Sequence, residues 1–129
     1  MVAERVALVP VPLSRRRERE RGFNQSALLA AALGAEIGLA TWPSVLQRTH
    51  FSSSQTRLTP TERLRNVSGA FRVAGDPAPL RGAHLVLVDD VVTTAATLNA
   101  CAAALFAGGA RAVSYVTFGR ARLPGDAPP

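Results

Sequence analysis

The sequence predicts an α/β domain with an open, mostly parallel sheet flanked by helices. Apolar runs typical of buried strands lie near the start of the chain, at residues 84–88 and at residues 112–118. Alanine-rich segments of helical composition separate these runs, as in repeated strand–helix–strand units. The 129 residues, 47% of them hydrophobic, suffice for one core. We place a single domain at residues 1–122 and a C-terminal tail at residues 123–129.

Strand and helix signals alternate in the first part of the chain. Residues 5–11 are mostly apolar and β-branched and end in Pro-Val-Pro, which predicts a strand. An arginine-rich segment follows at residues 15–21, and we predict a loop there. Residues 24–33 have helical composition, with Asn24 as the N-cap and Gly34 as the stop.

The middle of the chain carries weaker signals. Residues 45–47 and residues 70–73 are candidates for short strands, and residues 75–79 are rich in turn formers. Residues 49–59 are polar and serine-rich, so we expect a mobile loop there. A helical turn is predicted over residues 61–65.

The last part has the clearest pattern. Residues 84–88 form an apolar run bounded by turn signals, which is typical of a buried parallel strand. An alanine-rich helix is predicted over residues 97–106 and should close at Gly108 and Gly109. Residues 112–118 should form another buried strand.

Composition limits the function. The net charge is +6, and every basic residue is an arginine, a side chain suited to bidentate phosphate contacts. Cys101 is the one cysteine, so neither an internal disulfide nor a cysteine-rich zinc site can form, and we expect a small buried filler. No apolar stretch approaches the ~20 residues of a membrane span, and no signal peptide is evident. We therefore expect a cytoplasmic protein.

One segment carries chemistry. The strand at residues 84–88 delivers two adjacent carboxylates, Asp89 and Asp90, to its C-terminal end, where ligands bind in open α/β sheets. A loop of small and hydroxylated residues, 93–97, then opens the helix, whose N-terminus favours a phosphate. The carboxylates suit sugar hydroxyls or a magnesium ion held through water. The alternative is an Asp pair that only caps the helix.

This segment resembles the diphosphoribosyl-binding signature of type I phosphoribosyltransferases. The resemblance implies that Asp89 and Asp90 bind the ribose hydroxyls of phosphoribosyl pyrophosphate (PRPP) together with Mg²⁺. It also implies that the 5-phosphate lies on the loop formed by Thr93, Thr94, Ala95, Ala96 and Thr97. Family members usually carry glycine where this chain has Ala95, so a positive φ there would strain the loop.

Two further segments narrow the resemblance to the ComF family of competence-associated proteins. The first resembles its Pro-Val-Pro-Leu strand end followed by arginine and Arg-Gly-Phe-Asn-Gln, here at Pro10, Val11, Pro12, Leu13, Arg17, Arg21, Gly22, Phe23, Asn24 and Gln25. The second matches at Arg48, Gln55, Leu58, Glu62, Arg63, Asn66, Ala70 and Phe71. ComF relatives often begin with a cysteine-rich zinc ribbon, which this sequence lacks; we expect no zinc and leave open a short homologue, a trimmed chain or a late start codon.

The implied chemistry is phosphoribosyl transfer through an oxocarbenium-like transition state. The candidates for neutralising pyrophosphate or for forming a lid are Arg17, Arg21, Arg48, Arg57 and Arg63. No clear general base is present. His84 begins a core strand and is interpreted as structural, whereas His50 is a weak candidate on a polar loop.

Three functions remain open at this point. The chain could be a magnesium-dependent phosphoribosyltransferase with an unknown acceptor, or a module that senses PRPP or a nucleotide without turnover. It could also act in competence and DNA uptake through protein partners and single-stranded DNA. The arginine cluster permits DNA contact, although 5% aromatic residues argue against a stacking platform. A homodimer is also open.

Overall fold

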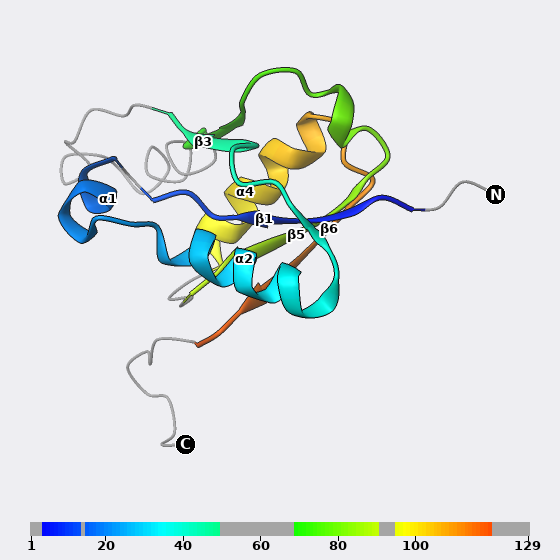
Figure 1. Cartoon of the computed structure of the whole chain (residues 1–129). Helices are drawn as coiled ribbons and strands as arrows, with labels where there is room; N and C mark the ends of the chain where they lie inside the picture. The colour runs from blue at the N-terminus through cyan, green and yellow to red at the C-terminus, as the bar shows by residue number, and fades with distance from the viewer. Residues whose placement is uncertain (1–3, 14, 50–68, 91–94, 120–129) are drawn as a thin grey trace, which may run out of the picture.

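The computed structural model describes residues 4–13, 15–49, 69–90 and 95–119, and for residues 15–17 it describes the backbone alone. The features predicted at residues 50–68, 91–94 and 120–129 lie outside this part, including most of the polar loop, the helical turn and the tail. Figure 1 shows a central sheet with helices on both sides. No helix within the described ranges is long and apolar enough to cross a membrane.

The main sheet has four parallel strands in the order β2-β1-β5-β6. Their bounds are β1 Val6–Pro10, β2 Ala40–Thr41, β5 His84–Asp89 and β6 Ala112–Thr117. This confirms the predicted open parallel sheet. The two central strands, β1 and β5, are in register from Val6 opposite His84 to Pro10 opposite Val88.

The weaker strand signals form a separate, antiparallel pair. β3 (Leu46–Arg48) pairs with β4 (Phe71–Val73), and the 3-10 helix η2 (Ala78–Leu80) follows β4. The sequence predicted both short strands without indicating that they leave the main sheet.

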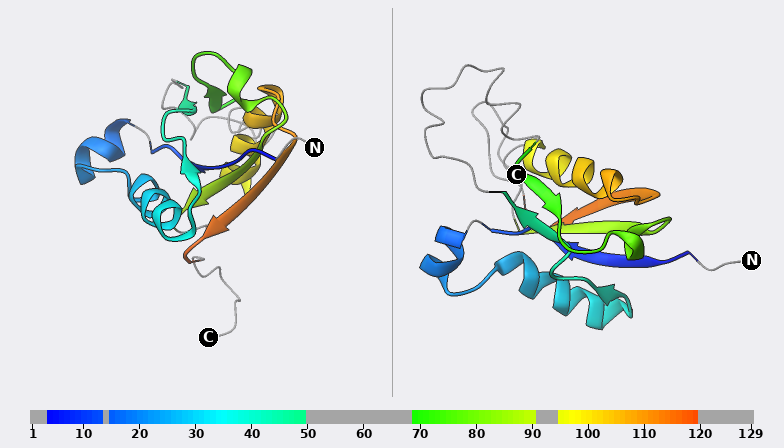
Figure 2. Two further views of the ribbon diagram at one scale, coloured as in Figure 1. Left: turned by 45° about the vertical axis from the view of Figure 1, so that its right-hand side comes forward. Right: turned by 90° about the horizontal axis from the view of Figure 1, so that it is seen from above.

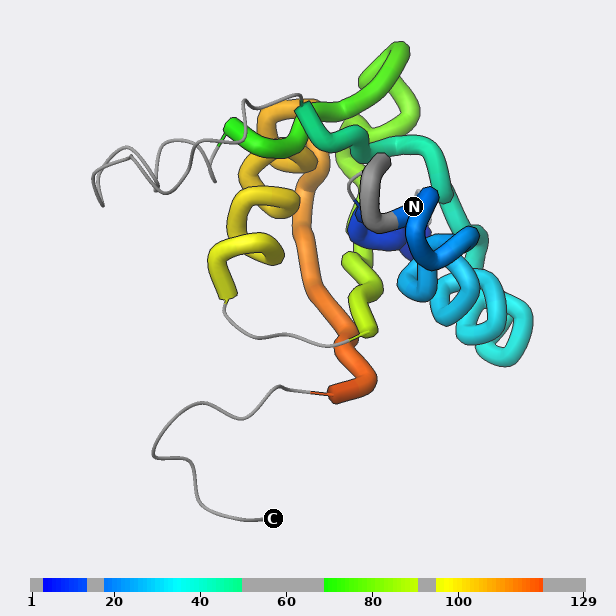
Figure 3. Tube along the Cα trace, turned by 90° about the vertical axis from the view of Figure 1, so that its left-hand side faces the viewer, coloured from blue at the N-terminus to red at the C-terminus, as the bar shows by residue number. Residues whose placement is uncertain are grey.

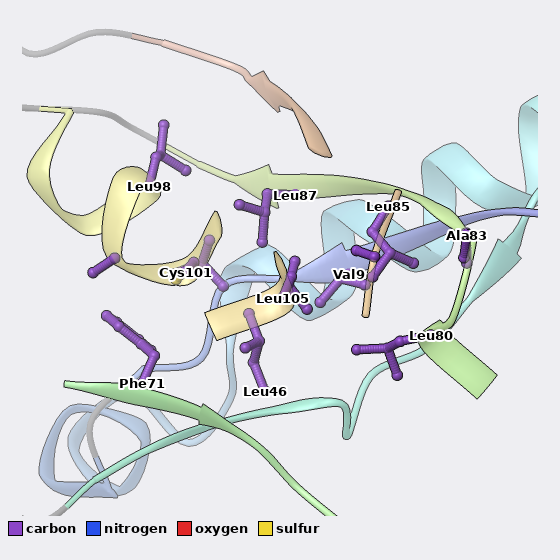
Figure 4. Close-up of a cluster of buried hydrophobic side chains, with 14 residues drawn as sticks. Val9, Leu46, Phe71, Leu80, Ala83, Leu85, Leu87, Leu98, Cys101 and Leu105 are labelled. Atoms are coloured by element: carbon purple, nitrogen blue, oxygen red, sulfur yellow. The ribbon is translucent and has the colours of Figure 1, made fainter. Parts of the chain in front are cut away.

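Two helices cover opposite faces of the main sheet. α4 (Ala96–Ala107) lies on one face and α2 (Gln25–Ile37) on the other, as Figures 2 and 3 show. The larger core lies on the α4 side, where Leu98, Cys101 and Leu105 pack toward Leu85 and Leu87 of β5 (Figure 4). A smaller cluster on the α2 side is formed by Leu8, Ala30 and Val88.

The helix predicted to stop at Gly34 continues to Ile37. Gly34 is buried inside α2, and a Cβ atom on it would lie 2.6 Å from Thr41 Oγ1 and 2.8 Å from the Leu39 carbonyl oxygen. The absence of a side chain at Gly34 therefore allows α2 to pack closely against the segment that follows it. The helix ends instead at Gly38, whose φ of 73° places it in the left-handed region that glycine tolerates.

The arginine-rich segment predicted as a loop is a helix, α1 (Arg15–Arg21). Arginine and glutamate are both good helix formers, so local propensity favours this structure. Glu18 lies in the first turn, and Arg19 and Arg21 lie in the last, as the helix dipole prefers. The prediction was wrong because it weighed charge above helix propensity.

Candidate functional site

The Asp pair lies at the C-terminal rim of the main sheet. Asp89 is the last residue of β5, and the side chains of Asp89 and Asp90 are half-buried. The Val11 amide donates to the Val88 carbonyl over 2.9 Å, so the pairing of β1 with β5 extends to this rim. The segments that follow β1 and β5 consequently begin side by side.

Asp89 is held by a helix from the other part of the chain. The Ser26 hydroxyl donates to Asp89 Oδ1 over 2.9 Å, and the Asp90 amide donates to the same oxygen over 2.9 Å. Burial raises the pKa of the Asp89 carboxyl, the Ser26 hydroxyl lowers it, and the neighbouring Asp90 raises it further. Two carboxylates held together in this way favour a ligand that brings positive charge or hydroxyl donors.

Ser26 is oriented by the N-cap of α2. Asn24 Oδ1 accepts from the Ser26 amide over 2.9 Å and from the Ala27 amide over 3.4 Å, which confirms Asn24 as the N-cap. Asn24 Nδ2 donates to the Val11 carbonyl over 3.3 Å. The cap thus attaches the start of α2 to the end of β1 and places Ser26, which is 2% exposed, beside β5. Sequence reasoning missed Ser26, because its contact spans 63 positions.

One predicted arginine reaches the Asp pair. Arg21 Nη1, at the end of α1, lies 4.0 Å from Asp90 Oδ2. The expectation that the arginine-rich segment and the two carboxylates share one rim is confirmed. Arg17 also lies in α1, where the backbone alone is described.

Arg48 lies elsewhere on this side of the protein. Its Nε donates to the Pro12 carbonyl over 2.9 Å, and its guanidinium carbon is 4.7 Å from the centroid of the Phe71 ring. These contacts attach β3 to the segment after β1, so Arg48 supports the loop between β1 and α1. Arg57 and Arg63 lie outside the described residues, and their roles stay predictions.

The start of α4 faces the same rim as the Asp pair, because it follows β5 after a short connection. Ala95 is its cap residue, with φ −78° and ψ −5° and no side-chain cap, and Ala96 and Thr97 begin the helix. The negative φ means that alanine fits this backbone without the strain considered for a positive φ. Thr93 and Thr94 lie outside the described part.

Two other residues with potentially reactive side chains lie apart from the Asp pair. Cys101 is fully buried, and burial raises the pKa of its thiol to about 12, so it is a core filler. His84 is at the opposite end of β5 from Asp89, where its Nε2 lies 2.7 Å from Ser114 Oγ and its Nδ1 lies 3.8 Å from Glu4 Oε1. His50 is outside the described residues.

The described residues contain no group of three or more potential metal-ligating side chains. Two adjacent carboxylates nevertheless fit Mg²⁺, which is commonly held by one or two carboxylates together with water and substrate phosphates. The rim therefore combines a carboxylate pair, a nearby guanidinium and a helix N-terminus.

Comparison with solved structures identifies the fold. The structure is similar to a solved structure described as "Structure of the allosteric regulatory enzyme of purine biosynthesis". The TM-score is 0.58 at 19% sequence identity, and the match covers 92% of this chain and 23% of that chain. At this identity the match establishes the fold alone, which is the α/β fold of type I phosphoribosyltransferases, as predicted.

Curated relatives define the family. DNA utilization protein YhgH of Salmonella typhi is 41% identical over 106 residues, which cover 82% of this chain and 45% of that protein. Competence protein ComFC of Bacillus subtilis is 38% identical over 112 residues, covering 86% of this chain and 42% of the relative. Competence protein F of Haemophilus influenzae is 33% identical over 93 residues, which cover 72% of this chain and 41% of that protein.

The chain belongs to the ComF family, as its motifs predicted. It spans less than half the length of these curated relatives. No family model matches it.

Proposed function

We propose that this competence-related, phosphoribosyltransferase-like protein binds PRPP at the C-terminal rim of its main sheet. The observation that supports the proposal is that β5 ends at Asp89, at the C-terminal rim, and that α4 begins shortly afterwards in the chain, at Ala96. Carboxylates accept hydrogen bonds from ribose hydroxyls, whereas a helix N-terminus donates them to a phosphate. PRPP carries both groups in one molecule.

Each part of the rim has a role in this proposal. Asp89, oriented by Ser26, and Asp90 accept from the ribose hydroxyls. The 5-phosphate is held by the segment from Thr93 to Thr97. Mg²⁺, bound near the two carboxylates, would neutralise the pyrophosphate charge.

Arg21 is positioned to assist with the pyrophosphate. Its side chain is 49% exposed and its Nη1 lies 4.0 Å from Asp90 Oδ2, which makes a weak, solvent-screened ion pair. Such a pair can open at little cost, so the guanidinium can turn toward a phosphate that binds beside Asp90. In a transfer reaction it would stabilise the charge that develops on the leaving pyrophosphate.

A titration of the protein with PRPP and Mg²⁺ in a calorimeter tests the proposal. Asp89→Asn with Asp90→Asn should weaken PRPP binding by about a hundredfold or more, because charge-assisted hydrogen bonds contribute about 1.5–3 kcal/mol each. The control variant, Glu36→Gln with Asp76→Asn, removes the same charge at two exposed positions on other elements. Equal affinity of the rim double variant and the parent chain would contradict the carboxylate role.

Turnover separates an enzyme from a sensing module. A phosphoribosyltransferase releases pyrophosphate when PRPP and the correct acceptor are both present, whereas a sensing module binds PRPP without releasing it. Pyrophosphate release across a panel of nucleobases and other nitrogen acceptors therefore distinguishes the two. Binding without release for every acceptor would favour the sensing module.

DNA contact is the second candidate function, and α1 favours it. Five of its seven residues are arginines, and the names of the relatives refer to DNA utilization and competence. If α1 contacts phosphates, the affinity for a single-stranded oligonucleotide should fall steeply with salt. Replacing Arg15, Arg16 and Arg19 with glutamine should reduce that slope, and an unchanged slope would exclude α1 as the contact.

A further inference from the structure

We propose that β6 is a pairing surface for a second copy of this chain, joining two main sheets through antiparallel β6–β6 contact. β6 is the last strand in the order β2-β1-β5-β6, and on its outer side no strand of the described residues pairs with it. Unpaired strand edges are templates for pairing with another chain. This inference does not depend on PRPP binding.

The backbone of β6 shows which groups face outward. The Ala112 amide donates to the Ala83 carbonyl over 3.4 Å, and the Phe118 amide donates to the Asp90 carbonyl over 3.1 Å, so both amides point toward β5. Backbone groups alternate in direction along a strand, so the amides and carbonyls of Val113, Tyr115 and Thr117 point away from β5.

These three positions are symmetric about Tyr115, and this symmetry selects a register. In an antiparallel pair with a two-fold axis at Tyr115, that residue lies opposite Tyr115 of the second copy. Val113 then lies opposite Thr117 of the second copy, and Thr117 lies opposite Val113 of the second copy. Each such pair exchanges two hydrogen bonds, so the contact closes about six of them.

The side chains of β6 favour such a contact. Tyr115 is in register with Leu87 on the α4 side yet is 61% exposed. Val116 and Phe118, on the opposite face, are 37% and 54% exposed. Pairing would cover apolar side chains on both faces of the strand, and the two tyrosines would form an aromatic cross-strand pair.

The β6 edge is compatible with a second copy as the partner, because its outward backbone groups are symmetric about Tyr115 and the strand itself carries no charge. Edge strands are usually guarded by charged residues, proline or bulges, yet residues 112–119 contain no charged residue and no proline. Two copies with a net charge of +6 each repel one another generally, but this segment adds nothing to the repulsion. A two-fold contact also presents the same surface from both chains, as most homodimers do.

The pairing leaves the candidate site accessible. β6 runs parallel to β5, and the Phe118 amide is already bonded to Asp90, so the pairing surface ends where the rim begins. In an antiparallel dimer the two C-terminal rims point in opposite directions. Each copy thus keeps its own site open to solvent.

Sedimentation equilibrium of the whole chain tests the proposal. The parent chain should form a concentration-dependent dimer. Tyr115→Lys places like charges opposite each other and should raise the dimer dissociation constant by about a hundredfold or more. Phe106→Lys makes the same change at a residue of α4 that is 49% exposed, and it should leave the dimer intact. Thermal melts of both variants verify folding.

Disulfide formation tests the register. Residues in a hydrogen-bonded antiparallel pair have Cα atoms about 5.5 Å apart, within the range for a disulfide. Tyr115→Cys should give a covalent dimer under mild oxidation, whereas Phe106→Cys should not, and buried Cys101 should not compete.

Three outcomes would overturn the proposal. The first is a parent chain that stays monomeric, even if it binds a foreign extended peptide at β6. The second is a dimer that Phe106→Lys disrupts and Tyr115→Lys does not. The third is a failure of Tyr115→Cys to form a cross-linked dimer.

Discussion

Two helices start near the same rim of the main sheet, and their starts differ. α2 begins at Asn24, whose extended backbone lets its side chain accept from the amides of Ser26 and Ala27. α4 has Ala95 as its cap residue, which has a helical backbone and a methyl side chain that cannot accept a hydrogen bond. The start of α2 is therefore capped by its own sequence and serves as support, whereas the start of α4 has no side-chain cap, and our proposal places the ligand phosphate there.

Ala95→Asp should abolish this difference and, among the substitutions at the two helix starts, should have the largest effect on PRPP affinity. A carboxylate at the start of α4 interacts favourably with the helix dipole and should raise the free energy of unfolding by a few tenths of a kcal/mol, up to about 1 kcal/mol. The same charge repels the phosphate, so PRPP affinity should fall by about tenfold or more. Calorimetric titration and urea unfolding measure the two effects. Ala95→Asn, a neutral control of similar size, should weaken PRPP binding less than Ala95→Asp.

Asn24→Ala should show that the start of α2 serves stability. Loss of the cap should lower the free energy of unfolding by about 1 kcal/mol. PRPP affinity should change by less than about threefold, because the Ser26 hydroxyl remains available to Asp89. Urea unfolding and calorimetry test both parts, with Asn24→Ser, which restores an acceptor, as the matched control. A large loss of affinity with no loss of stability would reverse the roles assigned to the two helix starts.

Asp89→Asn should remove a pH dependence of stability that belongs to the acidic rim. Burial raises the pKa of Asp89 in the folded chain, so the folded state binds its proton more tightly than the unfolded state. This contribution stabilises the fold at low pH and is lost as pH rises through the raised pKa. Asp89→Asn should therefore melt above the parent at neutral pH, and the difference should shrink as pH falls toward 3.8. Glu36→Gln, at an exposed position of α2, is the control in thermal melts across pH.

Ala95→Gly should have the smallest effect. Because φ of Ala95 is −78°, glycine relieves no strain and only increases the freedom of the loop. The free energy of unfolding should fall by about 0.5–1 kcal/mol, with PRPP binding weakened by about twofold to fivefold. Tighter PRPP binding by this variant would indicate that the ligand requires a loop conformation that alanine resists.

The same comparison shows what could be predicted from sequence. The Asn24 cap, the strand leading to Asp89 and the helix after Ala95 all follow from local patterns, because caps, apolar runs and alanine-rich segments act over a few residues. The motifs that resemble the ComF family indicated to which family the chain belongs. The open parallel sheet followed from these elements.

Other features depend on contacts that are distant in sequence. Ser26 supports Asp89 across 63 positions, and no local pattern marks it. Gly34 was interpreted as a stop because its close approach to Thr41 can be seen only in three dimensions. β2 has two residues, too few for a period-two pattern. By contrast, the helix α1 was predictable from the propensities of arginine and glutamate.

The most direct test of the account compares the two helix starts in one experiment. Amide chemical shifts of isotope-labelled protein, recorded by NMR during titration with PRPP and Mg²⁺, report each start separately. We predict large changes at Thr97 and Leu98 of α4 and small changes at Ala27 of α2. Equal changes at the two starts, or changes confined to α2, would contradict the assignment of the phosphate to α4.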